Sequence, residues 1–107
     1  MILGVGIDLL DIARIERPMR NKRFRERVFT AEELEYLSER GAESAAGLFC
    51  AKEAVAKALG IGIFQALKIV EITHTPTGQP VVSKPRGIMI SITHTRTTAA
   101  AVAIWGE

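Results

Sequence analysis

The hydrophobic and polar positions of this chain change their period near residue 62. Residues 2–8 form an apolar, partly β-branched run with two glycines, which predicts a buried strand that ends at Asp8. From there to Gly60 the apolar residues recur at helical spacing, and after Gly62 they form the short runs typical of strands. The first part of the chain is therefore expected to be mainly helical, and the last part mainly strands.

The first two predicted helices are short. Asp11 is expected to cap a helix that Pro18 stops or kinks, because proline lacks the N–H group that a helix interior needs. Thr30 and Glu33 have the spacing of a capping box, in which each side chain bonds the backbone of the other residue. A second helix is therefore expected from this box to Gly41.

The third predicted helix is the longest and would be central. Ser44 is expected to begin it and Gly60 to end it, and Glu53 and Lys57 lie on one face of its alanine-rich sequence. Such a pair stabilises an isolated helix by only about 0.2–0.5 kcal/mol. A mostly buried carboxylate is costly unless it is paired or bound to a metal. Glu53 is therefore expected either to pair with Lys57 or Lys52, or to bind a metal ion.

The last part of the chain is expected to form an antiparallel sheet. Pro80 suits the start or the edge of a strand, and His94 is expected at the tip of the last hairpin. Helices followed by strands indicate the α+β class: a single compact domain over residues 1–107, with a long central helix packed on a mostly antiparallel sheet. The predicted strands are 67–75, 80–83, 88–93 and 98–105.

The composition fits one small globular domain. The chain has 107 residues, of which 48% are hydrophobic and 24% are charged. Cys50 is the only cysteine, and we see neither a signal-peptide pattern nor an apolar stretch of the roughly 20 residues that cross a membrane. We therefore expect a reduced, cytoplasmic protein that is not bound to a membrane. A site that needs deep walls would have to take one from a neighbouring subunit, because a domain of this size buries little surface.

The positive charge is concentrated in residues 11–29. This segment carries seven basic and three acidic side chains, a net charge of +4, whereas the whole chain carries +2. Such a patch favours an acidic partner, which could be a nucleic acid, a phosphate-bearing ligand or an acidic protein. The alternative is a solvated helix face without a partner.

Two carboxylates are the main candidates for chemistry. Asp8 at the end of a strand and Glu53 on the central helix would form an oxygen site of the kind that Mg²⁺ prefers, although an Asp after a strand is more often a cap. His74, His94 and Cys50 have no recognised zinc spacing. The chain also lacks the Gly-x-Ser-x-Gly elbow and the phosphate-binding glycine motifs, which argues against covalent catalysis and a P-loop.

Four segments resemble the small trimeric 4′-phosphopantetheinyl transferases of the holo-(acyl carrier protein) synthase type, and they occur in the order found in that family. The residue pattern of the second segment, F-x-x-K-E-A-x-x-K-A-x-G, is the most specific. The segments span nearly the whole chain: Gly4-Val5-Gly6-Ile7-Asp8 followed by Arg14, Phe49 to Gly60, Gly78-Gln79-Pro80, and Ser91-Ile92-Thr93-His94-Thr95.

This resemblance implies a reaction and a role for each matching residue. The family transfers the 4′-phosphopantetheine arm of coenzyme A to a serine of apo acyl carrier protein and releases adenosine 3′,5′-bisphosphate, with Mg²⁺ as cofactor and a homotrimer that shares its active sites. Asp8 and Glu53 would bind the metal, and Lys57 would contact the transferring phosphate. The implied coenzyme A contacts are Lys57, Gly60, Pro80, His94 and Thr95. The implied carrier-protein contacts are Arg14, Arg17, Arg20, Arg23 and Arg25.

The chain departs from the family at two places. Leu48 stands where many relatives have a basic residue, and the connection over residues 83–87 is shorter than usual. Lys84 or Arg86 is a candidate to replace the missing charge. The alternatives to an enzyme are an RNA binder and an inactive relative that only docks an acidic protein. RNA binding is disfavoured because the few aromatic residues lie mostly at apolar-face positions rather than where they could stack on bases.

Overall fold

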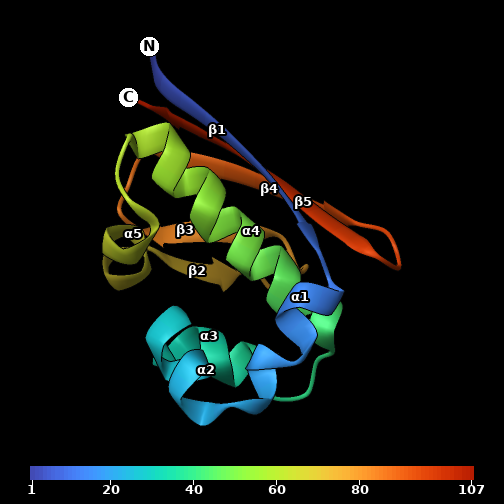
Figure 1. The fold of residues 1–107 in the computed structure, drawn as a ribbon. Helices are drawn as coiled ribbons and strands as arrows, with labels where there is room; N and C mark the ends of the chain where they lie inside the picture. The colour runs from blue at the N-terminus through green and yellow to red at the C-terminus, as the bar shows by residue number, and fades with distance from the viewer.

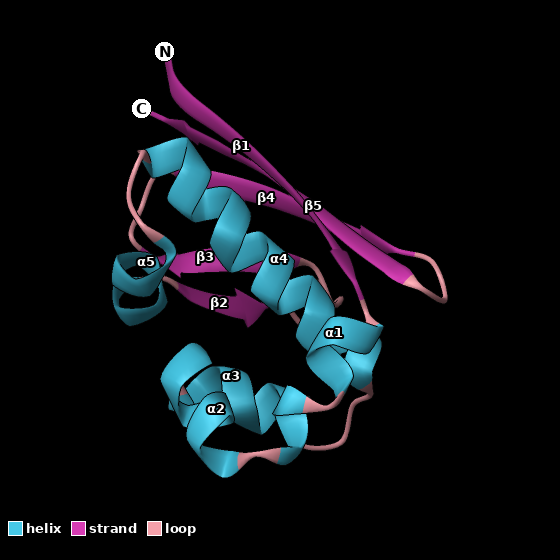
Figure 2. Ribbon diagram, viewed as in Figure 1, coloured by secondary structure: helices cyan, strands magenta, loops and turns pink.

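A long helix lies across one face of a three-stranded antiparallel sheet (Figures 1 and 2). The computed structural model describes residues 1–107. The helix is α4 (Ala42–Leu59), and the sheet has the order β1 (Ile2–Asp11), β5 (Thr98–Gly106), β4 (Ile88–His94). A second antiparallel pair consists of β2 (Glu71–His74) and β3 (Pro80–Lys84). The predicted α+β class with antiparallel strands is confirmed.

Strand β1 passes unusually close to α4. Gly4, Gly6 and Asp8 lie on the same face of the strand, because side chains alternate between the two faces. A Cβ atom built on Gly6 would lie 1.9 Å from the carbonyl oxygen of Ala54, and one on Gly4 would lie 2.0 Å from that of Ala58. The two glycines therefore allow direct contact between the backbones, and Asp8 is the next residue on this face.

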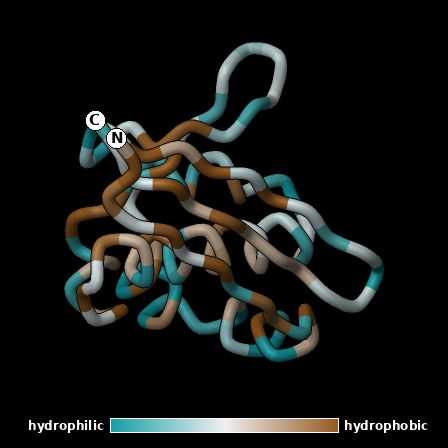
Figure 3. The backbone as a smooth tube through the Cα atoms, turned by 90° about the horizontal axis from the view of Figure 1, so that it is seen from above, coloured by the Kyte–Doolittle hydropathy of each residue, from teal (hydrophilic) through white to brown (hydrophobic).

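The other face of β1 is exposed, so the prediction of a buried strand is wrong for half of its residues. Val5, Ile7 and Leu9 are 60%, 67% and 71% exposed. Their neighbours across the ladder, Ile104 and Val102 on β5, are also apolar. The sequence pattern correctly predicted a hydrophobic strand, but this chain alone covers only one of its faces. The ends of the chain meet at one edge of the sheet, where the Met1 amino group donates to the Glu107 carbonyl at 2.9 Å (Figure 3).

Four short helical segments connect β1 to α4. Asp11 belongs to β1 and does not cap a helix, because the chain enters α1 through Ile12 without a side-chain cap. Pro18 ends the helical direction of α1 and begins a 3₁₀ turn, as the sequence predicts. The capping box of Thr30 and Glu33 is confirmed at the start of α3. The segments are α1 (Ala13–Glu16), η1 (Pro18–Arg20), α2 (Lys22–Val28) and α3 (Ala31–Leu37).

Helix α4 begins two residues earlier than predicted and ends where predicted. Gly41 rather than Ser44 precedes its first turn, and Gly60 closes it with a left-handed φ of 71° that glycine adopts without strain. The predicted strand over residues 67–75 is wrong in its first half. Helix α5 (Ile63–Ile69) occupies that part, since Ala66 and Leu67 face the core at helical spacing.

A buried ion pair connects α3, α4 and β2. The Lys52 ammonium donates to Glu33 and to the Val28 carbonyl, and both charged side chains are completely buried. Glu33 also accepts from the backbone N–H groups of Thr30 and Ile72. No buried side-chain nitrogen or oxygen in the molecule lacks a partner. This polar cluster therefore fixes α4 against the helical segment below it. No helix of this chain has the length and apolar character required to cross a membrane.

Candidate active site

The two predicted metal ligands come together where β1 crosses α4. Asp8 follows the two glycines on the inner face of β1, and Glu53 lies on α4 one residue before Ala54, which Gly6 contacts. Asp8 and Glu53 also line the same cavity, whose volume is about 340 Å³. The close contact between strand and helix thus places an acidic pair at the surface.

Lys57 contacts Asp8 and not Glu53. Its ammonium lies 3.2 Å from Asp8 Oδ1 and donates to the Ile7 carbonyl at 2.9 Å. Lys52 forms an ion pair with Glu33 and Lys57 forms one with Asp8, so neither of the lysines predicted to pair with Glu53 does so. The predicted ion pair of Glu53 with Lys57 or Lys52 is therefore wrong. Glu53 therefore has no side-chain partner at ion-pair distance in the structure.

The electrostatic environment of Glu53 is that of a carboxylate without its full counter-charge. Burial raises the pKa of Glu53 and the negative charge of Asp8 raises it further, whereas Lys57 lowers it. The neighbouring Cys50 is affected in the same way: burial first, and then Asp8, raise the pKa of its thiol to about 12. In both groups burial is the larger cause, and the negative charge of Asp8 adds to it.

These residues fit a magnesium ion. The donors are two carboxylates, and no cluster of three or more His, Cys, Asp or Glu side chains exists in the molecule. Mg²⁺ is commonly held by one or two carboxylates, with water and substrate phosphate completing an octahedron. A divalent cation would also relieve the repulsion that raises the pKa of Glu53.

A second cavity gathers two of the predicted coenzyme A contacts. Pro80 and His94 line a cavity of about 320 Å³ between α4, the β2–β3 pair and the end of β4. No residue lines both this cavity and the acidic one. Gly60 and Thr95 line neither: Gly60 caps α4, and the Thr95 hydroxyl accepts from the N–H groups of Thr97 and Thr98. The predicted residues thus form two separate groups within one chain.

Arg40 is a candidate binding residue that the sequence analysis missed. It lines the cavity of Pro80 and His94, and its guanidinium lies 4.1 Å from the centre of the Tyr36 ring. Tyr36 in turn stacks on His74 with ring centres 3.6 Å apart. Leu48 lines the same cavity, but Lys84 and Arg86 do not, so Arg40 supplies the nearby cation. The position of Arg40 could not be predicted from the sequence, because it depends on the packing of Tyr36 on α3 against His74 on β2.

The predicted carrier-protein arginines separate into different environments. Arg14 lines the acidic cavity beside Asp8 and Glu53. Arg17, Arg20 and Arg23 are exposed, as expected for docking residues. Arg25 is only half exposed, because its guanidinium donates to the Met19 carbonyl at 2.7 Å. Most side chains of this basic segment are therefore available to a partner, whereas Arg25 lines a third cavity.

Comparison with known proteins assigns the family. The sequence model of the 4′-phosphopantetheinyl transferase superfamily matches residues 4–104. The chain belongs to this superfamily. It is 43% identical to the holo-[acyl-carrier-protein] synthase of Treponema denticola, over 97% of this chain and 98% of that protein. It is 39% identical to the protein of that name from Caldicellulosiruptor bescii, over 97% and 98% of the two chains.

Solved structures extend the similarity from sequence to fold. A holo-(acyl-carrier-protein) synthase from Bacillus anthracis, in complex with CoA (3′,5′-ADP), superimposes with a TM-score of 0.87 and 32% identity, covering 98% of this chain and 96% of that one. The Helicobacter pylori holo-[acyl-carrier-protein] synthase in complex with coenzyme A has a TM-score of 0.85 and 29% identity, covering 95% and 99%. The fold expected from the resemblance is thereby confirmed.

Proposed function

We propose that this protein transfers the 4′-phosphopantetheine arm of coenzyme A to a serine of apo acyl carrier protein, which yields holo carrier protein and adenosine 3′,5′-bisphosphate. The observation that carries the proposal is the acidic pair Asp8 and Glu53 with Lys57 beside it, in a chain of the phosphopantetheinyl transferase superfamily. Relatives named holo-[acyl-carrier-protein] synthase match it over nearly their whole length.

The acidic pair and Lys57 would act on the pyrophosphate. Asp8 and Glu53 would hold Mg²⁺, which when bound neutralises charge that develops on the pyrophosphate oxygens of the leaving group. Lys57, one helical turn after Glu53, presents an ammonium that is more than half exposed and therefore free to contact the transferring phosphoryl group. The serine oxygen of the carrier would form a new bond to the β-phosphorus of coenzyme A and lose its proton to solvent. The bond from this phosphorus to the bridging oxygen would break, and adenosine 3′,5′-bisphosphate would leave with that oxygen. Arg14 at the rim would meet the carrier or its reacting serine region.

The cavity of Pro80 and His94 would receive the nucleotide end of coenzyme A. Arg40 is held on the Tyr36 ring and supplies a guanidinium for a phosphate, which suits the dianionic groups of this substrate. Gly60 and Thr95 remain proposed contacts on the strength of the resemblance. Both are exposed, so a substrate that extends beyond the cavity can reach them.

We propose a homotrimer in which neighbouring subunits share each active site. Two observations support this assembly. The acidic cavity and the nucleotide cavity have no residue in common, so one chain alone presents two partial sites. The outer face of the sheet exposes Val5, Ile7, Leu9 and Met89, an apolar surface of the kind that subunit interfaces bury.

The exposed cations of residues 14–23 would bind the acidic carrier protein. Charge complementarity mainly accelerates and orients such an encounter, so association is expected to weaken as salt is raised. Neither a nucleic acid nor a membrane is part of this proposal. The single buried cysteine suits a reducing compartment, and we place the reaction in the cytoplasm.

Intact-mass spectrometry tests the proposal directly. Apo acyl carrier protein incubated with this protein, coenzyme A and Mg²⁺ should gain one phosphopantetheine arm, and a chelator should prevent the gain. Asp8→Asn and Glu53→Gln should each lose most of the transfer while the fold is kept, whereas the exposed Glu35→Gln should transfer normally. A folded protein that binds the carrier but adds no mass to several carriers would instead be a docking module.

A further inference from the structure

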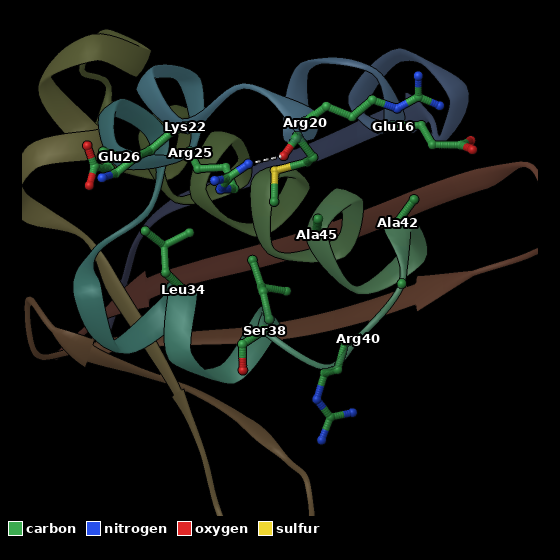
Figure 4. Close-up of a pocket in the computed structure, with 13 residues that line it drawn as sticks. Glu16, Arg20, Lys22, Arg25, Glu26, Leu34, Ser38, Arg40, Ala42 and Ala45 are labelled. Carbon is green, nitrogen blue, oxygen red and sulfur yellow. Dashed lines mark hydrogen bonds between the residues drawn. The ribbon is translucent and has the colours of Figure 1, made fainter.

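A third cavity touches the cavity of Pro80 and His94 only at Arg40 and shares no residue with the acidic cavity. Its volume is about 560 Å³, within the range of small-molecule sites. It opens between η1 and α2 on one side and the α3–α4 corner on the other (Figure 4). None of Asp8, Glu53, Lys57, Pro80 and His94 lines it, but Arg20 and Lys22 on its wall belong to the exposed cations proposed to bind the carrier protein.

The lining of this cavity combines an apolar surface with an excess of positive charge. Its hydrophobic residues are Met19, Leu34, Leu37, Ala42 and Ala45. Four cations and two carboxylates complete the wall: Arg20, Lys22, Arg25 and Arg40, with Glu16 and Glu26. None of these charged groups forms an ion pair, because the only ion pairs in the molecule are Lys52–Glu33 and Lys57–Asp8. The cavity therefore lacks the negative charge that would complement it.

Arg25 is the cation best placed to bind a ligand here. Figure 4 shows its side chain on the wall opposite Leu34, whereas Arg40 points away from the cavity. One nitrogen of Arg25 donates to the Met19 carbonyl at 2.7 Å, which fixes the guanidinium in place. A guanidinium has five N–H donors, and Arg25 uses only this one hydrogen bond within the protein. The N–H groups without a protein partner are accessible to solvent, because no buried side-chain nitrogen lacks a partner.

We propose that this cavity binds a small amphipathic carboxylate, that is, a hydrocarbon chain or ring that carries one carboxylate group. The carboxylate would form a forked pair with the preorganised Arg25 guanidinium, since the planar fork of arginine matches two carboxylate oxygens. The hydrocarbon part would lie on the partly buried Leu34 and Met19, next to the core residues Leu37 and Ala45. A simple anion would leave this apolar surface in water, and a neutral hydrocarbon would leave Arg25 without a counter-charge.

An NMR titration of the full-length protein with octanoate tests this proposal. Octanoate should shift the Leu34, Leu37 and Ala45 methyl signals saturably. It should bind at least about tenfold more tightly than acetate, which lacks the chain, and than 1-octanol, which lacks the charge. Inorganic phosphate should bind no more tightly than acetate. If acetate or phosphate bound as tightly as octanoate, the cavity would recognise only the negative charge. If 1-octanol bound as tightly as octanoate, Arg25 would have no role in binding. Either result overturns the proposal.

Two variants and one control separate this site from non-specific binding. Arg25→Gln should weaken octanoate binding at least about tenfold, because a charge-assisted pair is lost. Ala42 lies in the first turn of α4 and lines the cavity, so the larger side chain of Ala42→Leu should fill part of the cavity and weaken octanoate binding. This variant tests the site even if the Arg25 variant does not fold. Arg27→Gln on the same helix is exposed, does not line the cavity, and should change nothing.

Octanoate binding that neither variant weakens would contradict the proposed site. A different result would also contradict it: no saturable shift with octanoate, but shifts of the same methyl signals on addition of apo acyl carrier protein. The cavity would then belong to the protein partner and not to a small amphipathic anion.

Discussion

Two lysines on helix α4, only five positions apart, have opposite environments. Lys52 is fully buried and contacts Glu33 and the Val28 carbonyl, whereas the Lys57 side chain is 54% exposed and contacts Asp8 and the Ile7 carbonyl. Both lysines pair with one carboxylate and one backbone oxygen. The two lysines therefore have the same kinds of contact partner, and they differ only in how far they are buried.

Burial decides what each pair can do. Water has no access to the Lys52–Glu33 pair, so exchanging a partner there would leave a charge unsolvated in the interior. Lys57 can leave Asp8 at little cost, because an exposed ion pair contributes only about 0–1 kcal/mol. We infer that the Lys52–Glu33 pair stabilises the fold, and that the Lys57–Asp8 pair is free to reorganise when substrate arrives.

The largest expected effect is on stability, from Lys52→Met. This change leaves the Glu33 carboxylate buried without its cation, which typically costs about 3–5 kcal/mol. Urea unfolding followed by circular dichroism should show this loss in the free energy of unfolding. The double variant Lys52→Met with Glu33→Gln should recover part of it, since the amide removes the buried charge, although its single oxygen can accept from only one of the N–H groups of Thr30 and Ile72. A loss below about 1 kcal/mol in the single variant would contradict a structural role of the pair.

The second prediction concerns activity, with Lys57→Met. Removing a donor that stabilises charge in a transition state costs on the order of 10²–10³ in rate. Transfer should fall by about that factor, while the free energy of unfolding changes by less than about 1 kcal/mol. Initial rates of carrier modification and urea unfolding measure the two quantities. Lys68→Met, at an exposed position on α5 without an ion pair, is the matched control. Equal losses of stability in the Lys52 and Lys57 variants would remove the distinction between the pairs.

A smaller effect is expected on metal affinity. The Lys57 ammonium lies 3.2 Å from Asp8 Oδ1, one of the two carboxylate oxygens that could bind a metal ion. Lys57→Met should therefore tighten Mg²⁺ binding by up to about fivefold, the equivalent of an exposed ion pair. Calorimetric titration with Mg²⁺ in the absence of coenzyme A measures the change. Weaker Mg²⁺ binding by the variant would show that Lys57 does not compete with the metal.

The residues of the exposed pair could be singled out from the sequence, although their contact with each other was not predicted. Asp8, Glu53 and Lys57 could be singled out because charges interrupt apolar runs at fixed spacing, and a family resemblance connected them. The capping box predicted Glu33 as a helix cap, yet nothing local indicated that its oxygens would also reach Lys52 and Ile72. That contact joins residues 19 and 39 positions apart, so it depends on packing rather than on pattern.

The errors in the secondary structure have the same origin. Residues 67–69 contain an apolar pattern that suits a strand or a helix, and the helix forms because Ala66 and Leu67 pack on the core next to α4. The exposed face of β1 was predicted as buried because a hydrophobic strand looks the same in sequence whether its cover is the same chain or a second copy. Local patterns thus predicted most element types and the acidic pair, whereas the position of Arg40 at a cavity and the Lys52–Glu33 pair were evident only from the structure.

The smallest expected effect concerns Cys50, which lies on α4 two residues before Lys52. Burial and the Asp8 charge raise the pKa of its thiol to about 12, so at pH 8 only about one molecule in ten thousand carries a thiolate. A thiol reagent such as Ellman's should therefore leave the native protein unmodified and react fully after unfolding in urea. Lys57 lowers the pKa of Cys50, so Lys57→Met should raise it further and leave the native thiol inert. Lys52→Met should instead speed modification, because a destabilised fold opens more often. If Cys50 were labelled faster in the Lys57 variant than in the Lys52 variant, the Lys57–Asp8 pair rather than the Lys52–Glu33 pair would be the one that stabilises the fold.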